Sequence, residues 1–260
     1  MEKEEEQQSK VLKTLQGEEA DNKMLSLISH KLKTPLSIIN GYSEAILSQA
    51  PKENFSPFTA KALEEIHKQG TKLCGLVDKL LFFNKINSST TKDLAYKTIN
   101  LKELLKTCAN DAISHDEEMA SLPPSSTVSK RGTFIEIDCS PTLELKADPE
   151  LVSFMAEELL NNAIKFNNKS EKIIKVQCAN HGDSISISVR DYGTGIRPQD
   201  VKQIFERFHQ VDDYFTGQID GWGLGLTIVK KIMELHGGSI SVVSDRGLGS
   251  IFTLSFPLTA

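Results

Sequence analysis

Two long amphipathic patterns occupy the first third of the chain. Between Met24 and about Ile46, apolar residues recur at steps of three and four, which is the spacing of one face of an α-helix. A second such pattern runs from about Ala60 to Ile86, after a turn at 51–57. Each apolar stripe is narrow, so the two helices alone enclose little core. The pattern therefore predicts a helical hairpin that dimerises into a four-helix bundle.

The rest of the chain mixes both periodicities. Helical patterns are found at 101–114, 149–166 and 224–236, and alternating strand patterns at 134–137, 143–145, 173–178, 185–191, 240–244 and 251–256. Residues 117–132, which include two adjacent prolines, are predicted to form a flexible loop. Strands and helices segregate, which favours an α/β sandwich over a doubly wound parallel sheet.

The expected fold class is therefore α+β. A two-helix hairpin precedes a sandwich whose mixed sheet carries its helices on one face. The expected domains are a helical lead-in or linker at 1–22, a helical domain at 23–93 and a sandwich domain at 97–258.

Composition and charge limit the kinds of partner and the cellular compartment that we expect for this chain. The net charge of −5 over 260 residues argues against nucleic acid, which favours basic surfaces. The N-terminal residues lack the apolar core of a signal peptide, and no run of ~18 apolar residues occurs, so we expect no direct membrane contact in this chain. An upstream sensor region is compatible with this. The four cysteines form no Cys-x-x-Cys pair, so we expect reduced thiols and a cytoplasmic location.

The helix at 149–166 carries a polar stripe of candidate ligands. Glu158, Asn162 and Lys165 lie three or four residues apart and share one helix face. An amide oxygen together with nucleotide phosphates is a plausible shell for Mg²⁺. Lys165 could counter phosphate charge, although a solvated polar face would look the same.

Two glycine motifs follow. Asp191 ends a strand and precedes Gly193 and Gly195; a carboxylate there can accept a hydrogen bond from an adenine amino group. The segment Gly221–Gly225 leads into a helix, whose free N–H groups favour phosphate oxygens. It is neither a dinucleotide fingerprint nor a Walker loop. The polar stretch 210–220 before it is predicted to be a lid.

A separate histidine completes the constellation. His30, within Ser29–Leu36, falls off the apolar stripe of the first helix and is expected to face solvent. Pro35 should bend that helix just after it. An ATP site together with a separately mounted histidine suggests phosphoryl transfer to that histidine.

In this order the motifs resemble those of sensor histidine kinases, whose ATP-binding domain shares a fold with DNA gyrase, heat-shock chaperones and mismatch-repair ATPases. The resemblance spans 24–257. The matching segments are Ser29–Leu36 for the H box, Asn162 for the N box, Asp191–Gly195 and Gly221–Gly225 for the two glycine boxes, Phe205–Phe208 for the F box, and Gly247–Ser250 for the turn before the last strand.

The resemblance implies a role for each matching residue. His30 would be phosphorylated, with Lys31 and Thr34 beside it in the catalytic helix. Thr34 would position water for dephosphorylation of the partner protein, a response regulator. Asn162 and Glu158 would hold Mg²⁺. The implied ATP-binding residues are Asn162, Lys165, Phe166, Asp191, Gly193, Gly195, Ile196, Phe208, Gly221, Gly223, Leu224, Gly225 and Leu226. The implied partners are a second copy of the chain and the receiver domain of a response regulator.

Three residues depart from the family pattern. Lys31 replaces the usual acidic residue and cannot accept a proton from the histidine. A phosphatase-dominant or weak kinase is therefore one alternative. An ATP-binding dimeric signalling scaffold without kinase activity is another. Glu158 stands where many relatives have Asn, which leaves open some ATP hydrolysis besides the Mg²⁺ role. Trp222 replaces a small polar residue, either covering the lid or packing.

Overall fold

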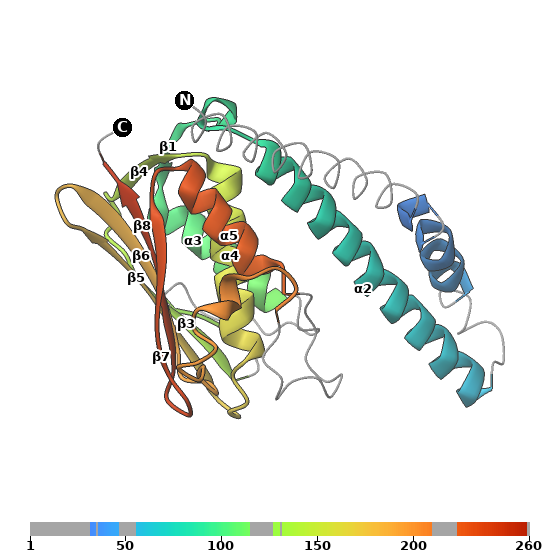
Figure 1. The fold of residues 1–260 in the computed structure, drawn as a ribbon. Coiled ribbons are helices and arrows are strands. Elements are labelled where there is room, and N and C mark those ends of the chain that lie inside the picture. Colours follow the sequence, from blue (N-terminus) through green and yellow to red (C-terminus); the bar gives the residue numbers. More distant parts are fainter. Residues whose placement is uncertain are drawn as a thin grey trace. The chain divides into compact units, whose positions relative to one another are not determined.

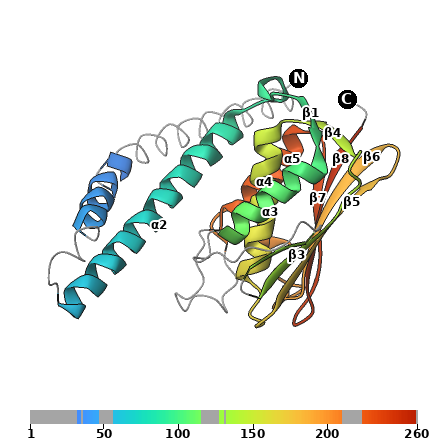
Figure 2. The same ribbon diagram turned by 180° about the vertical axis from the view of Figure 1, so that it is seen from behind.

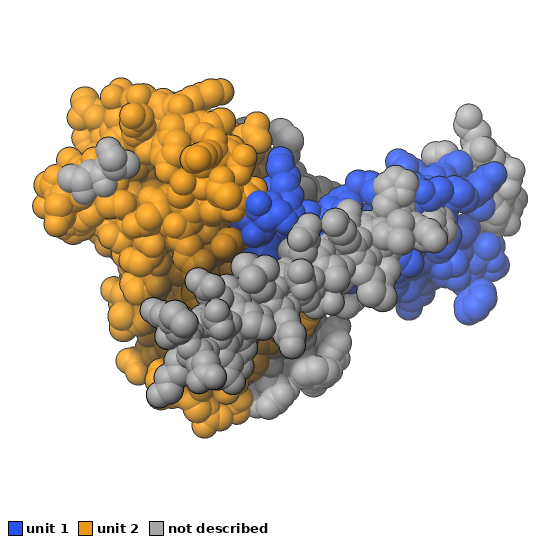
Figure 3. Space-filling model, turned by 45° about the horizontal axis from the view of Figure 1, so that its top comes forward, with its two compact units in different colours: residues 1–88 blue, residues 89–260 orange. Residues whose placement is uncertain are grey.

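The computed structural model describes residues 32–34, 36–46, 56–114, 127–130, 132–209 and 223–258. The chain divides into two compact units, residues 1–88 and residues 89–260, which are coloured separately in Figure 3. Each unit is described by itself below. Along the described residues, no helix combines the length and the apolarity needed to cross a bilayer.

The first unit contains an antiparallel helical hairpin. Residues 36–46 are helical, and α2 spans Pro57–Ser88, slightly beyond the predicted 60–86. Lys33 Nζ lies 2.5 Å from Asp78 Oδ1, while Ser43 Oγ lies 3.3 Å from His67 Nδ1. As the residue number of the contacting residues rises along one helix, it falls along the other, so the two helices run in opposite directions.

Gly70 sets the closest approach within this hairpin. A Cβ atom at Gly70 would lie 1.9 Å from Oδ1 of Asn40, whose Nδ2 donates to Cys74 Sγ at 3.4 Å. The absence of a side chain at Gly70 therefore makes room for the amide of Asn40.

Among the described residues, much of the predicted apolar stripe of the first helix is exposed. Leu36 is buried, but Leu32 is 42% exposed and Tyr42 is 70% exposed. Ile39 and Ile46 are exposed as well. The periodicity therefore predicts correctly that residues 32–34 and 36–46 are helical, while 24–31 lie outside the described residues. The hairpin buries only part of the apolar face that the described residues form.

The second unit is a layered α/β sandwich. Its six-stranded sheet has the order β2-β3-β5-β6-β8-β7, and the helices α3, α4 and α5 cover one face (Figures 1 and 2). The sheet elements are β2 (Thr127–Lys130), β3 (Thr133–Asp138), β5 (Lys172–Asn180), β6 (Ser184–Asp191), β7 (Ser239–Asp245) and β8 (Gly249–Pro257). The helices are α3 (Leu101–Ser114), α4 (Pro149–Lys165) and α5 (Gly225–Leu235). Short 3₁₀ turns lie at Thr91–Asp93 and Gln203–Phe205.

The sheet is mixed, as the sequence predicts. β3 and β5 run parallel, while the other neighbouring pairs are antiparallel. Along β6, Ile185, Ile187 and Val189 are buried, and alternate residues are not. On α5, Ile228 and Ile232 are wholly buried, so the helix and strand patterns meet in one core.

Two short strands were not predicted. β1 (Lys97–Asn100) pairs with β4 (Glu144–Ala147) in a separate two-stranded sheet. β2 lies inside the segment 117–132, for which the prediction of a loop is wrong at Thr127–Lys130, where β2 pairs with β3. β1 and β2 each contain a single aliphatic residue, which is too few to show alternation, and pairing with another segment decides their conformation.

Candidate functional site

The start of α4 is fixed by its cap. Asp148 Oδ1 accepts hydrogen bonds from the backbone N–H groups of Glu150 at 3.1 Å and Leu151 at 3.3 Å. Pro149 occupies the first turn, where its missing N–H costs nothing. The cap and the proline together set where this helix begins.

The polar stripe of α4 faces away from the core. Leu159, Leu160 and Ala163 are buried, whereas Glu158 and Asn162 are partly exposed. The predicted division of the helix into two faces is therefore confirmed. Asn162 and Glu158 present oxygen atoms one helical turn apart, on the same side.

Glu158 reaches the beginning of α5. A Cβ atom at Gly225 would lie 2.1 Å from Glu158 Oε2, so the carboxylate lies beside the first residue of α5. Leu224, the N-cap of that helix, makes no side-chain cap hydrogen bond. A carboxylate at this end is stabilised by the helix dipole, and the same end of a helix attracts phosphate.

Lys165 and Phe166 contact each other at the end of α4. Lys165 Nζ lies 4.6 Å from the centroid of the Phe166 ring, a cation–π contact. Phe166 is the C-cap, and its backbone N–H bonds to Asn162 O at 2.9 Å. The ammonium group is thus held close to the helix end that follows Asn162.

Asp191 is a buried carboxyl group at the end of β6. It is 6% exposed, and its Oδ1 accepts a hydrogen bond from Gly193 N at 2.8 Å. Burial raises the pKa of Asp191, and hydrogen bonds from the backbone of Gly193 and Ser250 only partly oppose that rise. The group is therefore an acceptor held in a fixed position in a poorly solvated place.

The loop after Asp191 is held on two sides. On one side, Thr194 N donates to Phe166 O at 3.0 Å, and a Cβ atom at Gly193 would lie 2.3 Å from that same oxygen. On the other side, Gly195 has φ +64°, and a Cβ atom there would lie 2.0 Å from Asp245 O. Both glycines are therefore needed for close backbone approach.

Two residues of this region were not assigned roles from the sequence. Ser244 Oγ accepts a hydrogen bond from Ile196 N at 2.8 Å and donates to Gly249 O at 2.9 Å. Gly249 has φ +94°, and a Cβ atom there would lie 2.2 Å from Asp191 O. The glycine turn at 247–250 signals Gly249, whereas nothing in the sequence distinguishes Ser244 from neighbouring strand serines.

The F box contacts the second glycine motif. Phe208 N donates to Gly223 O at 3.0 Å, and Thr227 Oγ1 donates to Phe205 O at 3.0 Å. Gly223 has φ +66°, and a Cβ atom there would lie 2.5 Å from His209 O. Phe208 itself has φ +59° and is 57% exposed.

The remaining predicted residues of this motif divide in two groups. Leu224 is 1% exposed, so its side chain belongs to the core and only its backbone can meet a ligand; Leu226 is half-buried. Gly221, Trp222 and the predicted lid at 210–220 lie outside the described residues.

The phosphoacceptor region is described only in part. His30, Lys31 and Pro35 lie outside the described residues. Thr34 is helical and exposed, and it lines a surface hollow together with Lys33, Ser37 and Ile38. This hollow places the Thr34 hydroxyl where a molecule from solvent can approach it.

The donor set fits Mg²⁺ better than a transition metal. Within the described ranges, no three His, Cys, Asp or Glu side chains gather to hold a metal. Asn162 and Glu158 instead offer two hard oxygen donors on a partly exposed face. Mg²⁺ commonly takes one or two protein ligands of this kind and completes its shell with phosphates and water.

Family models match both units. Residues 20–89 match the model of the His Kinase A (phospho-acceptor) domain. Residues 147–260 match the model of the histidine kinase-, DNA gyrase B- and HSP90-like ATPase. The two matches include the predicted phosphoacceptor and the predicted glycine motifs respectively.

Curated proteins with similar sequences agree with the matches to the family models. The sensor histidine kinase YkoH of Bacillus subtilis is 32% identical over 228 residues, which are 88% of this chain and 46% of that protein. The phosphate regulon sensor protein PhoR of Pseudomonas aeruginosa is 28% identical, over 95% of this chain and 52% of its own length. The non-motile and phage-resistance protein of Caulobacter vibrioides is 28% identical, and the chain spans 28% of it.

Solved structures show the same fold. The crystal structure of full-length ShkA in complex with AMPPNP matches with a TM-score of 0.68 and 23% identity, covering 90% of this chain and 45% of that one. The histidine kinase AdeS of Acinetobacter baumannii matches with a TM-score of 0.55 and 18% identity, covering 89% of this chain and 98% of that one.

Proposed function

We propose, for a chain that belongs to the sensor histidine kinase family, that the second unit binds Mg·ATP and that its γ-phosphoryl group is transferred to His30. The observation that carries the proposal is the convergence at the end of β6. There Asp191, the loop to Gly195, the end of α4 and the turn at Gly249 are held together by backbone contacts that tolerate only glycine. A phosphoacceptor domain on the same chain supplies the destination.

Asp191 would recognise the base. Its buried carboxylate accepts hydrogen bonds and so suits the amino group of adenine, while it would repel the carbonyl oxygen of guanine. Leaving such a buried acceptor unpaired is costly, so the wrong base is disfavoured strongly. The substrate class that fits is therefore an adenine nucleotide.

The start of α5 and the end of α4 would bind the triphosphate. The N–H groups in the first turn of α5, which begins at Gly225, and the dipole of this helix favour phosphate oxygens. Lys165 brings a positive charge from the end of α4. Mg²⁺, when bound, neutralises phosphate charge, and Asn162 and Glu158 would be its protein ligands.

His30 would attack the terminal phosphorus through a neutral ring nitrogen, in line with the leaving oxygen of ADP. A receiver-domain aspartate of a response regulator would then take the phosphoryl group. We place this chemistry in the cytoplasm. Lys31 offers no proton acceptor beside the ring, so we expect slow autophosphorylation, since losing a general base costs roughly 10²–10⁴-fold.

A homodimer would complete the helical unit. Leu32, Ile39, Tyr42 and Ile46 leave an apolar stripe exposed along the first helix. Such a stripe is the seam that helices of a four-helix bundle bury against each other. A second copy of the hairpin would cover it.

Labelling with γ-³²P-ATP tests the proposal. We expect acid-labile, alkali-stable label that disappears in His30→Gln and persists in His67→Gln, the matched control on α2. Lys31→Glu should increase the labelling rate. A folded chain that binds ATP but never takes up label would overturn the kinase assignment. If that chain still dephosphorylates a receiver domain, Thr34 and a phosphatase role are favoured; if it does neither, a scaffold is favoured.

A further inference from the structure

The sheet brings two cysteines together that the sequence keeps far apart. In the parallel pair β3–β5 the last recorded partners are Asp138 and Gln177. Cys139, the first residue after β3, and Cys178 on β5 follow one step later, so an extension of this register places them opposite each other. Partners in a ladder project to the same face, here the one on which Ile137 and Val176 are buried under the helices.

Burial changes the acidity of both thiols. Burial raises the pKa of Cys139, and a hydrogen bond from Cys178 opposes that rise. Burial also raises the pKa of Cys178, and the same hydrogen bond to Cys139 adds to the effect. Of the two sulfurs, that of Cys139 ionises first, because the pKa of Cys178 is raised further. Cys139 is 5% exposed and Cys178 is partly exposed.

The spacing suits a covalent link. Neighbouring strands lie roughly 4.7–4.9 Å apart, and disulfides join Cα atoms roughly 4.4–6.8 Å apart. No large backbone movement is needed to join two residues that are opposite each other on paired strands. The other two cysteines, Cys74 on α2 and Cys108 on α3, are not placed this way.

We propose that Cys139 and Cys178 form an oxidisable dithiol, which hydrogen peroxide converts into an intramolecular disulfide. The Cys139 thiolate attacks one peroxide oxygen and the O–O bond breaks. This gives a sulfenic acid and a hydroxide, which leaves as water with the proton lost by Cys139. The Cys178 sulfur then attacks the Cys139 sulfur, the S–O bond breaks, and a second water leaves with the Cys178 proton. Two thiols are oxidised, and one peroxide is reduced to two waters.

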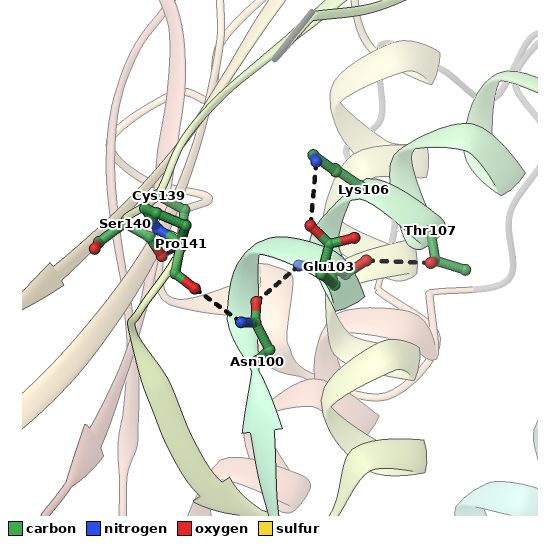
Figure 4. A network of polar contacts seen from close by, with 7 residues as sticks. All are labelled: Asn100, Glu103, Lys106, Thr107, Cys139, Ser140 and Pro141. Carbon is green, nitrogen blue, oxygen red and sulfur yellow. Dashed lines mark hydrogen bonds and ion pairs between the residues drawn. The ribbon is translucent and has the colours of Figure 1, made fainter. Parts of the chain in front are cut away.

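The chain around Cys139 also fixes the start of α3. Cys139 Sγ donates to Ser140 O at 3.7 Å. Asn100 Nδ2 donates to Pro141 O at 2.9 Å (Figure 4). Asn100 Oδ1 in turn accepts from Glu103 N at 3.1 Å, in the first turn of α3. Oxidation removes the S–H donor of Cys139 and anchors this turn to β5.

The disulfide would close a loop that contains β4 and all of α4, including Asn162. A cross-link around a loop of this length restricts the unfolded chain, so the oxidised second unit should melt several degrees higher. Because the pKa of each thiol is raised, little thiolate exists near neutral pH. Oxidation should therefore be slow there and accelerate roughly tenfold per pH unit below the pKa of Cys139.

The test uses the full chain, treated with excess hydrogen peroxide, alkylated and digested without reductant. We expect a peptide pair that joins Cys139 to Cys178, lighter by two hydrogens than the free thiols, and a higher melting temperature that dithiothreitol reverses. Cys139→Ser and Cys178→Ser should abolish both changes, while the matched controls Cys74→Ser and Cys108→Ser should retain them.

The wild-type peptide map alone decides the matter if a serine variant fails to fold. Free alkylated thiols at both positions after oxidation at alkaline pH would overturn the proposal. Sulfinic acid at either position without a cross-link would overturn it as well. The outcome does not depend on phosphotransfer, because the readouts are a covalent bond and a melting temperature.

Discussion

Nε2 of His236 accepts a hydrogen bond from the backbone N–H of Asp148, at a distance of 3.2 Å, and so joins the end of α5 to the start of α4. Nδ1 of the same ring lies 2.9 Å from Ile232 O and is the donor to that carbonyl. Tyr96 and Phe256 contact the ring edge-to-face. Both hydrogen bonds require the neutral tautomer that carries its proton on Nδ1.

Acid should weaken the second unit through His236. Burial lowers the pKa of His236 below its ordinary value of 6.5, so the unfolded chain takes up a proton at this site before the folded chain does. The contribution of His236 to the free energy of unfolding is fully present above pH 6.5. It is lost as the pH falls through the pKa of His236 in the folded chain. Denaturant unfolding across this window should show a falling free energy of unfolding.

The variant His236→Gln removes this dependence. It should cost about 1–2 kcal/mol at neutral pH, from the lost hydrogen bond and ring contacts, and lose less stability on acidification than the wild type. Equal slopes in the two proteins would show that another group governs the acid response. His181→Gln, at an exposed site, is the matched control.

Replacing Asp191 should separate binding from stability. Asp191→Asn keeps the shape but removes the ionised acceptor, so we expect ATP affinity to fall by at least about tenfold. The raised pKa of Asp191 means that its ionised form disfavours folding above pH 3.8, so the variant should be no less stable than the wild type at neutral pH. Calorimetric titration and thermal melting measure the two effects. A large loss of stability with unchanged affinity would contradict the assigned role.

Gly195 should be intolerant of a side chain for two reasons that can be separated. Gly195→Ala meets both a positive φ and Asp245 O at 2.0 Å. Gly182→Ala, in the β5–β6 hairpin, meets a positive φ of +91° but no atom within 4 Å. We expect about 1–2 kcal/mol of destabilisation for Gly182→Ala from backbone strain alone. Gly195→Ala should cost clearly more and also weaken ATP binding. An equal loss of unfolding free energy in the two variants would mean that the contact with Asp245 relaxes freely.

In the helical unit, Gly70 and Gly75 form a matched pair on α2. A Cβ atom at Gly75 meets nothing within 4 Å, so Gly75→Ala should stabilise the helix by up to about 1 kcal/mol. Gly70→Ala gains the same propensity but displaces the Asn40 amide and breaks its bond to Cys74. We therefore expect Gly70→Ala to have the lower melting temperature of the two. The opposite order would show that Asn40 does not pack there.

Glu158 should make nucleotide binding depend on Mg²⁺. Its carboxylate lies beside Gly225, where the start of α5 would receive phosphate, so like charges meet unless a cation lies between them. Glu158→Gln should weaken ATP binding several-fold when Mg²⁺ is present and strengthen it several-fold in a chelator. Titrations in both buffers measure this. A change of equal size and sign in the two buffers would exclude a role in the metal shell. Loss of basal ADP release in the variant would reveal water activation by Glu158.

The amino-acid sequence was sufficient to predict those parts of the fold that depend on local spacing. The apolar steps of α2, the alternation along β6 and the proline-capped start of α4 follow from which side chains fall on one face of an element. The order of the glycine motifs led to a prediction of the segments that bind a nucleotide, and this stays a prediction. The motif of Asp191, Gly193 and Gly195 could be recognised from the sequence, because it needs only a predicted strand end followed by glycines.

The contacts between distant segments could not be predicted in this way and follow from the three-dimensional fold. The conformation of β2 depends on its pairing with β3, and the role of Ser244 depends on a donor from Ile196. Cys139 and Cys178 become neighbours through the order of the sheet. Periodicity reports which face of an element a residue occupies. It carries no information on which element packs against that face, because burial against any apolar partner is favourable. Backbone pairing and close packing select the particular partner.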